Sequence, residues 1–169
     1  SGQKVQSQPN RRHIDADVRL FLVGSFSEDG LYYQTLQAYI KKLGLGDSVI
    51  FPGHIRFEEV LAYYSIGDIF LCQSEHEGFC VPLVEAMLFD IPIVAYDSTA
   101  IAETVGQGGI VLDTKDPAVT GCAIRRILTD SALRACIRAG QKEQLDAFSY
   151  NRVRAQFELL FAQFLEGTL

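Results

Sequence analysis

Two glutamates, Glu77 and Glu85, are the side chains whose type and spacing are best suited to chemistry in this sequence. They lie in a stretch that follows a short apolar run ending at Cys72 and that opens a predicted helix near Pro82. Glu77 falls in the loop and Glu85 about one turn inside the helix, so both carboxylates can border the same crevice. Carboxylates accept hydrogen bonds well from vicinal hydroxyls, such as those of a ribose or a hexose.

The backbone between the two glutamates is suited to an anion. The first N–H groups of a helix have no partner within it, and the helix dipole favours negative charge there, most simply a phosphate. Gly78 has no side chain and allows close approach of the backbone. A diphosphate between two sugars is therefore the ligand that this arrangement suggests. Spacing alone leaves a second interpretation open, because a glutamate in the first turn also simply complements the helix dipole.

The elements that would position this stretch alternate between short apolar runs and segments with helical spacing. Buried strands are predicted at residues 18–23, 49–51, 68–72, 91–96 and 109–112. Helices are predicted at residues 32–43, 57–64, 82–88 and 100–105. Residues 97–99 are interpreted first as the cap of the last of these helices and second as a contact with the cleft. Strands that are apolar on both faces and separated by helices are typical of a parallel sheet covered on two sides. In such sheets, ligands bind at the carboxyl ends of the strands.

Beyond Asp113 the pattern predicts helices alone. Asp116 followed by Pro117 is expected to open a helix that runs to about Leu128, while Asp130 and Ser149 can cap the next two. The apolar stripe of the last helix is interpreted as core or interdomain packing and comprises Tyr150, Val153, Phe157, Leu160, Phe161 and Phe164. The sequence thus predicts one α/β domain over residues 18–169 with a C-terminal helical tail, preceded by a polar segment at residues 1–17.

Composition excludes several classes of protein. The chain has a net charge of −6 and is 48% hydrophobic, which argues against disorder and against nonspecific binding to nucleic acid or an anionic membrane. No run reaches the ~20 apolar residues that span a bilayer. The four cysteines, at positions 72, 80, 122 and 136, have neither C-x-x-C nor zinc-ligand spacing, which favours reduced, partly buried thiols in a cytoplasmic protein.

The run Glu77-Gly78-Phe79-x-x-Pro82-x-x-Glu85-Ala86-Met87, followed by Ile91-Pro92-Ile93-Val94-Ala95, resembles the E-x7-E region of retaining glycosyltransferases of family 4. Residues 22–24 and 49–55 resemble strands of the donor domain of those enzymes. The family has the GT-B architecture, in which two Rossmann-like domains enclose the active site. The resemblance implies that residues 18–169 form the C-terminal, donor-binding half, a Rossmann-like parallel sheet flanked by helices. Residues 1–17 would be a remnant of its first helix.

The resemblance also assigns roles to individual residues. Glu77 corresponds to the first motif glutamate, which contacts hydroxyls of the donor sugar near the reacting centre, and is the expected catalytic residue. Glu85 corresponds to the second, which binds the ribose. Backbone N–H groups of residues 78–81 would contact the sugar and diphosphate, and residues 53–55 would line the base pocket. The full set of implied donor-binding residues is Gly53, His54, Ile55, Gly78, Phe79, Cys80, Val81, Val84 and Glu85.

The implied activity is transfer of a sugar, with retention, from a UDP- or GDP-linked donor to a glycan or lipid-linked acceptor. This places the protein in polysaccharide biosynthesis, in the cytoplasm or at the inner face of the membrane. No cofactor or metal is expected beyond the nucleotide-sugar substrate, and no nucleic acid is an expected partner.

Two departures from the family pattern stand out. Cys80 occupies a position where many members carry glycine, and no G-R-x-x-x-x-K-G segment precedes Val18 to supply the basic pair that neutralises the diphosphate. The acceptor-binding N-terminal domain is also missing, so the chain alone is expected to be inactive.

Two alternatives stay open at this point. A GT-B epimerase or phosphorylase shares the fold and similar glutamates, although the five lysines match no pyridoxal-phosphate motif: Lys4, Lys41, Lys42, Lys115 and Lys142. A non-catalytic scaffold domain would keep the fold without binding a donor.

Overall fold

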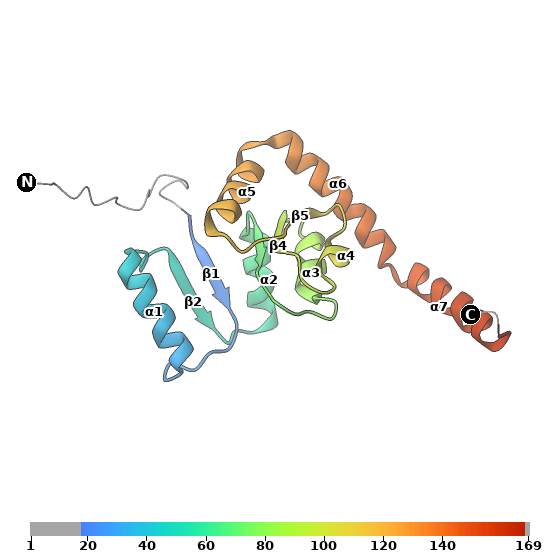
Figure 1. Ribbon diagram of the computed structural model, residues 1–169, viewed down its shortest axis with the longest axis horizontal. Coiled ribbons are helices and arrows are strands. Elements are labelled where there is room, and N and C mark those ends of the chain that lie inside the picture. Colours follow the sequence, from blue (N-terminus) through green and yellow to red (C-terminus); the bar gives the residue numbers. More distant parts are fainter. Residues whose placement is uncertain (1–17, 168–169) are drawn as a thin grey trace, which may run out of the picture. The chain divides into compact units, whose positions relative to one another are not determined.

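The computed structural model describes residues 18–167, in which strands and helices alternate before a run of three helices (Figure 1). The elements are β1 (Leu20–Val23), α1 (Leu31–Leu43), β2 (Val49–Gly53), α2 (Phe57–Ile66), β3 (Phe70–Cys72), α3 (Val81–Leu88), β4 (Ile93–Tyr96), α4 (Ile101–Val105), β5 (Gly109–Leu112), α5 (Pro117–Thr129), α6 (Ser131–Ala147) and α7 (Tyr150–Leu165). The predicted order of elements is confirmed. The predicted polar segment at residues 1–17 lies outside the described residues.

The chain divides into two compact units, Ser1–Tyr63 and Tyr64–Leu169, here called the N-terminal and C-terminal units. The prediction that residues 18–169 form one domain stays a prediction.

In the N-terminal unit, β1 pairs in parallel with β2, with Leu20 opposite Val49. An aromatic cluster joins α1 to this pair: the ring of Tyr33 stacks on Phe26 at 4.6 Å between centroids and meets Phe51 edge-on at 5.3 Å. The prediction of a buried first strand is wrong, because Leu20 and Val23 are each 39% exposed. Within the described residues β1 has only β2 as a neighbouring strand, which leaves it an edge strand.

In the C-terminal unit, the strands form a parallel sheet in the order β3-β4-β5. The central strand β4 is buried on both faces. Ile93 and Ala95 join one apolar cluster with residues of α3 and α4, while Val94 joins a second cluster with Ile127 of α5 and Ile137 of α6. The predicted parallel sheet covered by helices on both sides is therefore confirmed in this unit.

Two of the predicted helix caps are present. The Asp116 carboxylate accepts hydrogen bonds from the backbone N–H groups of Ala118 and Val119, and Asp130 accepts one from that of Leu133. The predicted cap at Ser149 is wrong in its chemistry: Ser149 occupies the N-cap of α7, but its hydroxyl makes no capping hydrogen bond. Its extended backbone, directly after the end of α6, places it there without help from the side chain.

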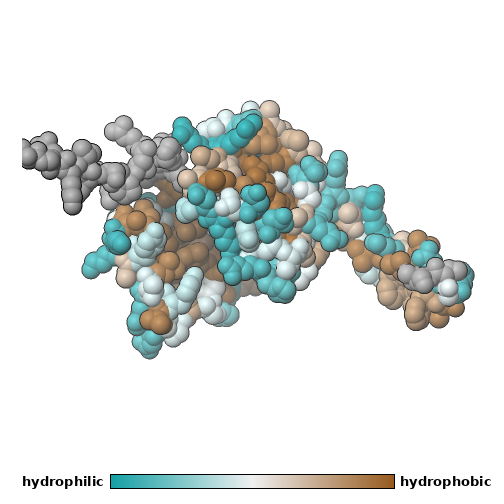
Figure 2. Space-filling view, in the orientation of Figure 1, coloured by the Kyte–Doolittle hydropathy of each residue, from teal (hydrophilic) through white to brown (hydrophobic). Residues whose placement is uncertain are grey.

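The apolar stripe of α7 is exposed. Phe157 and Phe164 are 65% and 67% exposed, and Figure 2 shows apolar surface over this helix. The interpretation of the stripe as core is wrong for the C-terminal unit, because no other described element covers it; interdomain packing stays a prediction. No helix among residues 18–167 combines the length and apolar character needed to cross a membrane.

Candidate functional site

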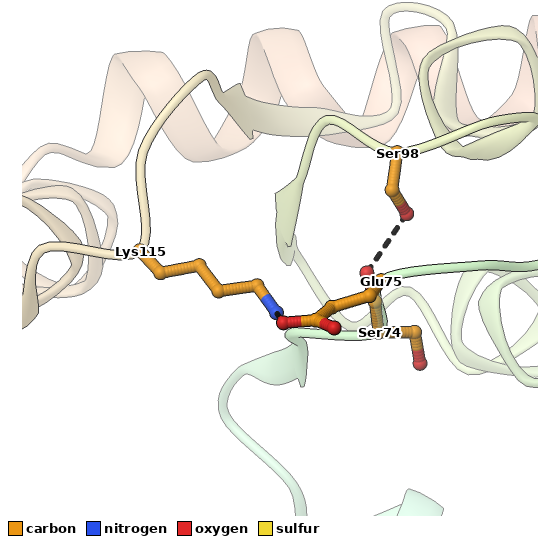
Figure 3. A network of polar contacts seen from close by, with 4 residues as sticks. All are labelled: Ser74, Glu75, Ser98 and Lys115. Atoms are coloured by element: carbon orange, nitrogen blue, oxygen red, sulfur yellow. Dashed lines mark hydrogen bonds and ion pairs between the residues drawn. The ribbon is translucent and has the colours of Figure 1, made fainter.

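The β3–α3 loop, residues 73–80, carries Glu77 and is fastened by hydrogen bonds from hydroxyl groups. Thr99 holds the backbone of Glu77 on both sides: its Oγ1 accepts from the Glu77 N–H at 2.9 Å and donates to the Glu77 carbonyl at 2.6 Å. Ser98 Oγ donates to the Ser74 carbonyl at 2.8 Å (Figure 3), and Thr104 Oγ1 donates to that of Phe79 at 2.9 Å. The loop is therefore fixed at three points along its length.

This arrangement corrects the interpretation of residues 97–99 as a helix cap. Ala100, not one of residues 97–99, is the N-cap of α4, and its side chain makes no capping hydrogen bond because alanine carries no polar group. Ser98 and Thr99 use their hydroxyls on the loop instead. A contact with the cleft was the second interpretation of Ser98 and Thr99, and Thr104 was not predicted as a site residue. The partners of all three lie at least 22 residues away along the chain.

Lys115, from the segment between β5 and α5, reaches the same loop. Its Nζ lies 3.0 Å from Oε1 of Glu75 (Figure 3) and 4.8 Å from the centre of the Tyr96 ring. Exposed ion pairs contribute little to stability, and the Glu75 side chain is 84% exposed. The contact nevertheless brings a cation within two residues of Glu77.

Glu85 is held by a tyrosine. The Tyr64 hydroxyl donates to Oε2 of Glu85 at 2.9 Å, and the Tyr64 ring stacks against Phe70 and Phe89. Burial, together with the hydrogen bond and the negative charge of Glu85, raises the pKa of Tyr64 well above its ordinary value. Tyr64 therefore stays protonated and remains a donor to the carboxylate.

The start of α3 has the openness that the predicted anion site requires. Cys80, its N-cap, has a left-handed backbone with φ of 62°, and its side chain makes no capping hydrogen bond. A Cβ added at Gly78 would meet no atom within 4 Å. The loop thus leaves free space beside Gly78. Of the other residues predicted here, Val81 and Phe79 are exposed, while Val84 is half-buried.

Beside Phe79 lies a shallow depression of about 200 Å³. Its lining residues are Gly78, Phe79, Ala100, Glu103, Thr104 and Phe148. The Phe79 ring meets Phe148 edge-on with 5.1 Å between centroids, so this aromatic pair forms one wall.

Cys72, Glu77 and Cys80 form a cluster that the sequence analysis missed. Their sulfur and carboxylate oxygen atoms all lie within 4.8 Å of one another, and both cysteines are buried. Burial, followed by the neighbouring Cys72 and Glu77, raises the pKa of the Cys80 thiol to about 12. A thiol with such a pKa is a poor nucleophile at neutral pH. The only sequence signal was a cysteine at each end of the β3–α3 loop.

The four cysteines are free thiols. Cys72 and Cys80 are buried as expected, whereas Cys122 and Cys136 are exposed, so the prediction of partial burial is wrong for that pair. Both lie on the outer faces of α5 and α6, away from the buried stripes around Ile127 and Ile137.

The predicted base-pocket residues lie in the N-terminal unit. Gly53 ends β2 with φ of 77°, a backbone conformation that favours glycine. His54 is exposed, its Nδ1 lies 3.3 Å from the Ser25 hydroxyl, and Ile55 is half-buried. The C-terminal unit thus brings together the predicted residues 77–85, while residues 53–55 form a separate group in the other unit.

Comparison with known proteins gives a consistent result. The family model of glycosyl transferases group 1 matches residues 5–144. A curated relative, the GDP-mannose-dependent alpha-(1-6)-phosphatidylinositol monomannoside mannosyltransferase of Mycolicibacterium smegmatis, is 30% identical over 86% of this chain and 40% of its own length. The chain spans less than half the length of the first curated relatives that it matches.

Two solved structures are also similar. Anabaena HepE, solved with UDP-glucose, is 23% identical with a TM-score of 0.74 over 88% of this chain and 42% of that one. The C-terminal domain of the group 1 protein LpcC of Francisella tularensis is 26% identical with a TM-score of 0.62, over 72% of this chain and 64% of that one. The α/β fold with parallel sheets flanked by helices matches these GT-B glycosyltransferase structures.

Proposed function

The chain belongs to the glycosyl transferases group 1, and we propose that it is the donor-binding, C-terminal part of a family 4-type retaining glycosyltransferase. The similarity to an isolated C-terminal domain of a group 1 protein supports this placement. The stretch from Glu77 to Glu85 has the E-x7-E pattern of that family, and it lies at the carboxyl end of β3, where open α/β sheets bind their ligands.

In this proposal the two glutamates bind the two sugars of the donor. Glu77 accepts hydrogen bonds from the hydroxyls of the transferred sugar, and Glu85 accepts them from the ribose. The N–H groups of residues 78–81 face the sugar and diphosphate, with Val84 beside the ribose or base. Gly53, His54 and Ile55, in the N-terminal unit, line the base pocket.

The protein contributes positioning and electrostatics to the reaction. Transfer proceeds on the front face of the sugar with retention, while the enzyme holds the donor and stabilises the charge that develops on the departing diphosphate. The N-terminus of α3 directs its partial positive charge toward that group. No side chain of the described residues is assigned as a ligand of a catalytic metal, and no cofactor beyond the nucleotide sugar is proposed.

The donor is a UDP- or GDP-linked sugar. HepE was solved with UDP-glucose, and the mycobacterial relative is named for its dependence on GDP-mannose. The acceptor is a glycan or lipid-linked glycan, as in polysaccharide biosynthesis, and the cytoplasm or inner membrane face stays the predicted location. Because the chain covers under half of its curated relatives, the proposal also holds that it transfers no sugar by itself.

One observation carries the proposal: each of the two glutamates is held by a hydroxyl-bearing residue, Glu77 through its backbone and Glu85 through its carboxylate. Thr99 fixes the backbone of Glu77, and Tyr64 fixes the side chain of Glu85. Preorganised acceptors of this kind favour binding because their ordering has no further entropic cost.

Calorimetric titration of the chain with UDP, GDP, UDP-glucose and GDP-mannose tests the proposal. Glu85→Gln is expected to lower the affinity for both the free nucleotide and the nucleotide sugar at least about 10-fold, the usual effect of losing one charge-assisted hydrogen-bonding group. Glu77→Gln is expected to lower the affinity for the nucleotide sugar but not the affinity for the free nucleotide. Glu143→Gln, an exposed glutamate on α6, is the matched control and is expected to change neither.

Two results would contradict this reading. If none of the four ligands binds, either to this chain or to a longer protein that contains it, the scaffold alternative is favoured. Sugar transfer catalysed by the purified chain alone would overturn the proposal that it is inactive.

A further inference from the structure

The two ends of the β3–α3 loop bring two thiols together near the Glu77 carboxylate. Cys72 is the last residue of β3 and Cys80 is the N-cap of α3, so the loop leaves the sheet and returns to it between them. One ligand atom from each of Cys72, Glu77 and Cys80 lies within 4.8 Å of the others. We propose that these three residues form a binding site for a thiophilic divalent cation, of which Zn²⁺ is the representative.

The donor set selects this class of ion. Two sulfurs and one carboxylate oxygen suit Zn²⁺, Cd²⁺ or Co²⁺, whereas Mg²⁺ and Ca²⁺ prefer oxygen ligands alone. Zinc–sulfur bonds of about 2.3 Å in a tetrahedron place two sulfurs about 3.8 Å apart. The observed spread of at most 4.8 Å therefore needs a contraction of only ~1 Å or less around an ion. Three protein ligands leave a fourth position for water.

The setting of the cluster is asymmetric. Cys72 and Cys80 are 7% and 9% exposed, while Glu77 is half-buried. An ion would therefore approach from solvent past Glu77, and it would lose its water ligands where it meets the buried thiols. The hydrogen bonds of Thr99 fix the backbone of Glu77, whose carboxylate lies within 4.8 Å of both sulfurs. Metal binding replaces the thiol protons, which leave to solvent as each thiolate–metal bond forms.

Occupancy would have a consequence for the donor. Glu77 is the carboxylate assigned to the transferred sugar, and an ion that coordinates it withdraws it from that role. This consequence rests on the proposed function, whereas the metal site does not. A titration with metal in the absence of nucleotide therefore tests the site by itself.

The experiment is a titration of the reduced chain, kept under a non-thiol reductant, with Zn²⁺ by calorimetry and with Co²⁺ by absorbance. We expect one saturable equivalent and the intense thiolate-to-metal charge-transfer band of a sulfur-ligated Co²⁺. Cys72→Ser and Cys80→Gly are each expected to weaken binding at least about 100-fold, and Glu77→Gln about 10-fold, given the usual effect of losing a ligand or its support. Mg²⁺ is expected to produce no heat of binding.

Cys122→Ser and Cys136→Ser are the matched controls, because both residues are exposed and lie outside the cluster. They are expected to bind Zn²⁺ as the unaltered chain does. Cys80→Gly suits the test because glycine adopts the φ of 62° without strain, so the variant is expected to fold. Circular dichroism checks that it does. Cys72→Ser tests the same site by an independent substitution.

The absence of saturable binding would overturn the inference. So would binding that survives both Cys72→Ser and Cys80→Gly, or that disappears in Cys122→Ser or Cys136→Ser. The metal site and the proposed function fail separately: Zn²⁺ binding without nucleotide binding contradicts the donor role alone, and nucleotide binding without Zn²⁺ binding contradicts the metal site alone.

Discussion

The hydroxyl of Tyr64 donates a 2.9 Å hydrogen bond to Oε2 of Glu85 and so joins the end of α2 to α3. The tyrosine is itself held between Phe70 and Phe89, with ring centroids 6.1 and 5.5 Å away. One oxygen of the Glu85 carboxylate is thereby fixed by the protein. The rotamer of Glu85 is set before any ligand arrives, which reduces the entropy lost on binding.

Tyr64→Phe is expected to weaken nucleotide binding about 5- to 10-fold, because a net hydrogen bond of about 1–1.5 kcal/mol orients the ribose-binding carboxylate. The aromatic stack remains, so the fold is expected to persist. Calorimetry with UDP and GDP measures the effect, and Tyr63→Phe, at the adjacent tyrosine, is the control. Equal affinity in Tyr64→Phe and the unaltered chain would show that Tyr64 does not position Glu85.

Thr99→Ala is expected to loosen the β3–α3 loop, because it removes the one hydroxyl that bonds both the N–H and the carbonyl of Glu77. Thr99→Ser keeps that hydroxyl and removes only the methyl group on Cβ. Thr99 has a φ of 42°, a conformation that is disfavoured for β-branched residues. Hydrogen exchange of residues 74–79 is the measurement. Faster exchange in Thr99→Ala, with unchanged exchange in Thr99→Ser, is the expected pattern; equal rates in both would contradict it.

The order of elements could be predicted from the sequence because each signal is local. Apolar runs such as residues 91–96 gave the buried strand β4, and Asp116 followed by Pro117 gave the start of α5. The stretch from Glu77 to Glu85 was placed correctly across a loop and a helix start for the same reason.

The contacts that hold the site could not be predicted, because they join distant parts of the chain. Thr104 and Phe79 are 25 residues apart, Tyr64 and Glu85 are 21 apart, and Ser98 and Thr99 had a plausible local role as helix caps. Exposure of β1 and of the α7 stripe also depends on neighbours, which periodicity does not identify.

Gly140→Ala is expected to destabilise the C-terminal unit by about 2 kcal/mol, the usual cost of overpacking. A Cβ at Gly140 of α6 would overlap the carbonyl of Gln107. Gly121→Ala is the matched control in α5, where an added Cβ meets nothing within 4 Å. It is expected to stabilise the helix by up to about 1 kcal/mol. Urea unfolding of both variants measures the difference; a Gly140→Ala chain as stable as Gly121→Ala would refute this packing.

Cys80→Gly is expected to be more stable than Cys80→Ala by about 1 kcal/mol, because both lose the thiol but only alanine keeps a Cβ in the left-handed region. The φ of 62° at Cys80 is the basis of this expectation. Urea unfolding compares the two, and equal midpoints would indicate that the backbone relaxes when the thiol is removed.

The raised pKa of Cys80, about 12 compared with 9.0 for a free thiol, links stability to alkaline pH. A group whose pKa is higher in the folded state binds its proton more tightly there, so its stabilising contribution is complete below pH 9 and declines as pH rises toward 12. The raised pKa of Tyr64 acts in the same direction above pH 10. The free energy of unfolding is therefore expected to fall with pH from about 9 upward, by at most about 1.4 kcal/mol per pH unit for each group. Urea unfolding at a series of pH values measures this dependence. Between pH 9 and 10, where Tyr64 does not yet contribute, the free energy of unfolding of Cys80→Gly should fall less steeply than that of the unaltered chain. An unchanged slope in that variant would mean that another group causes the pH dependence.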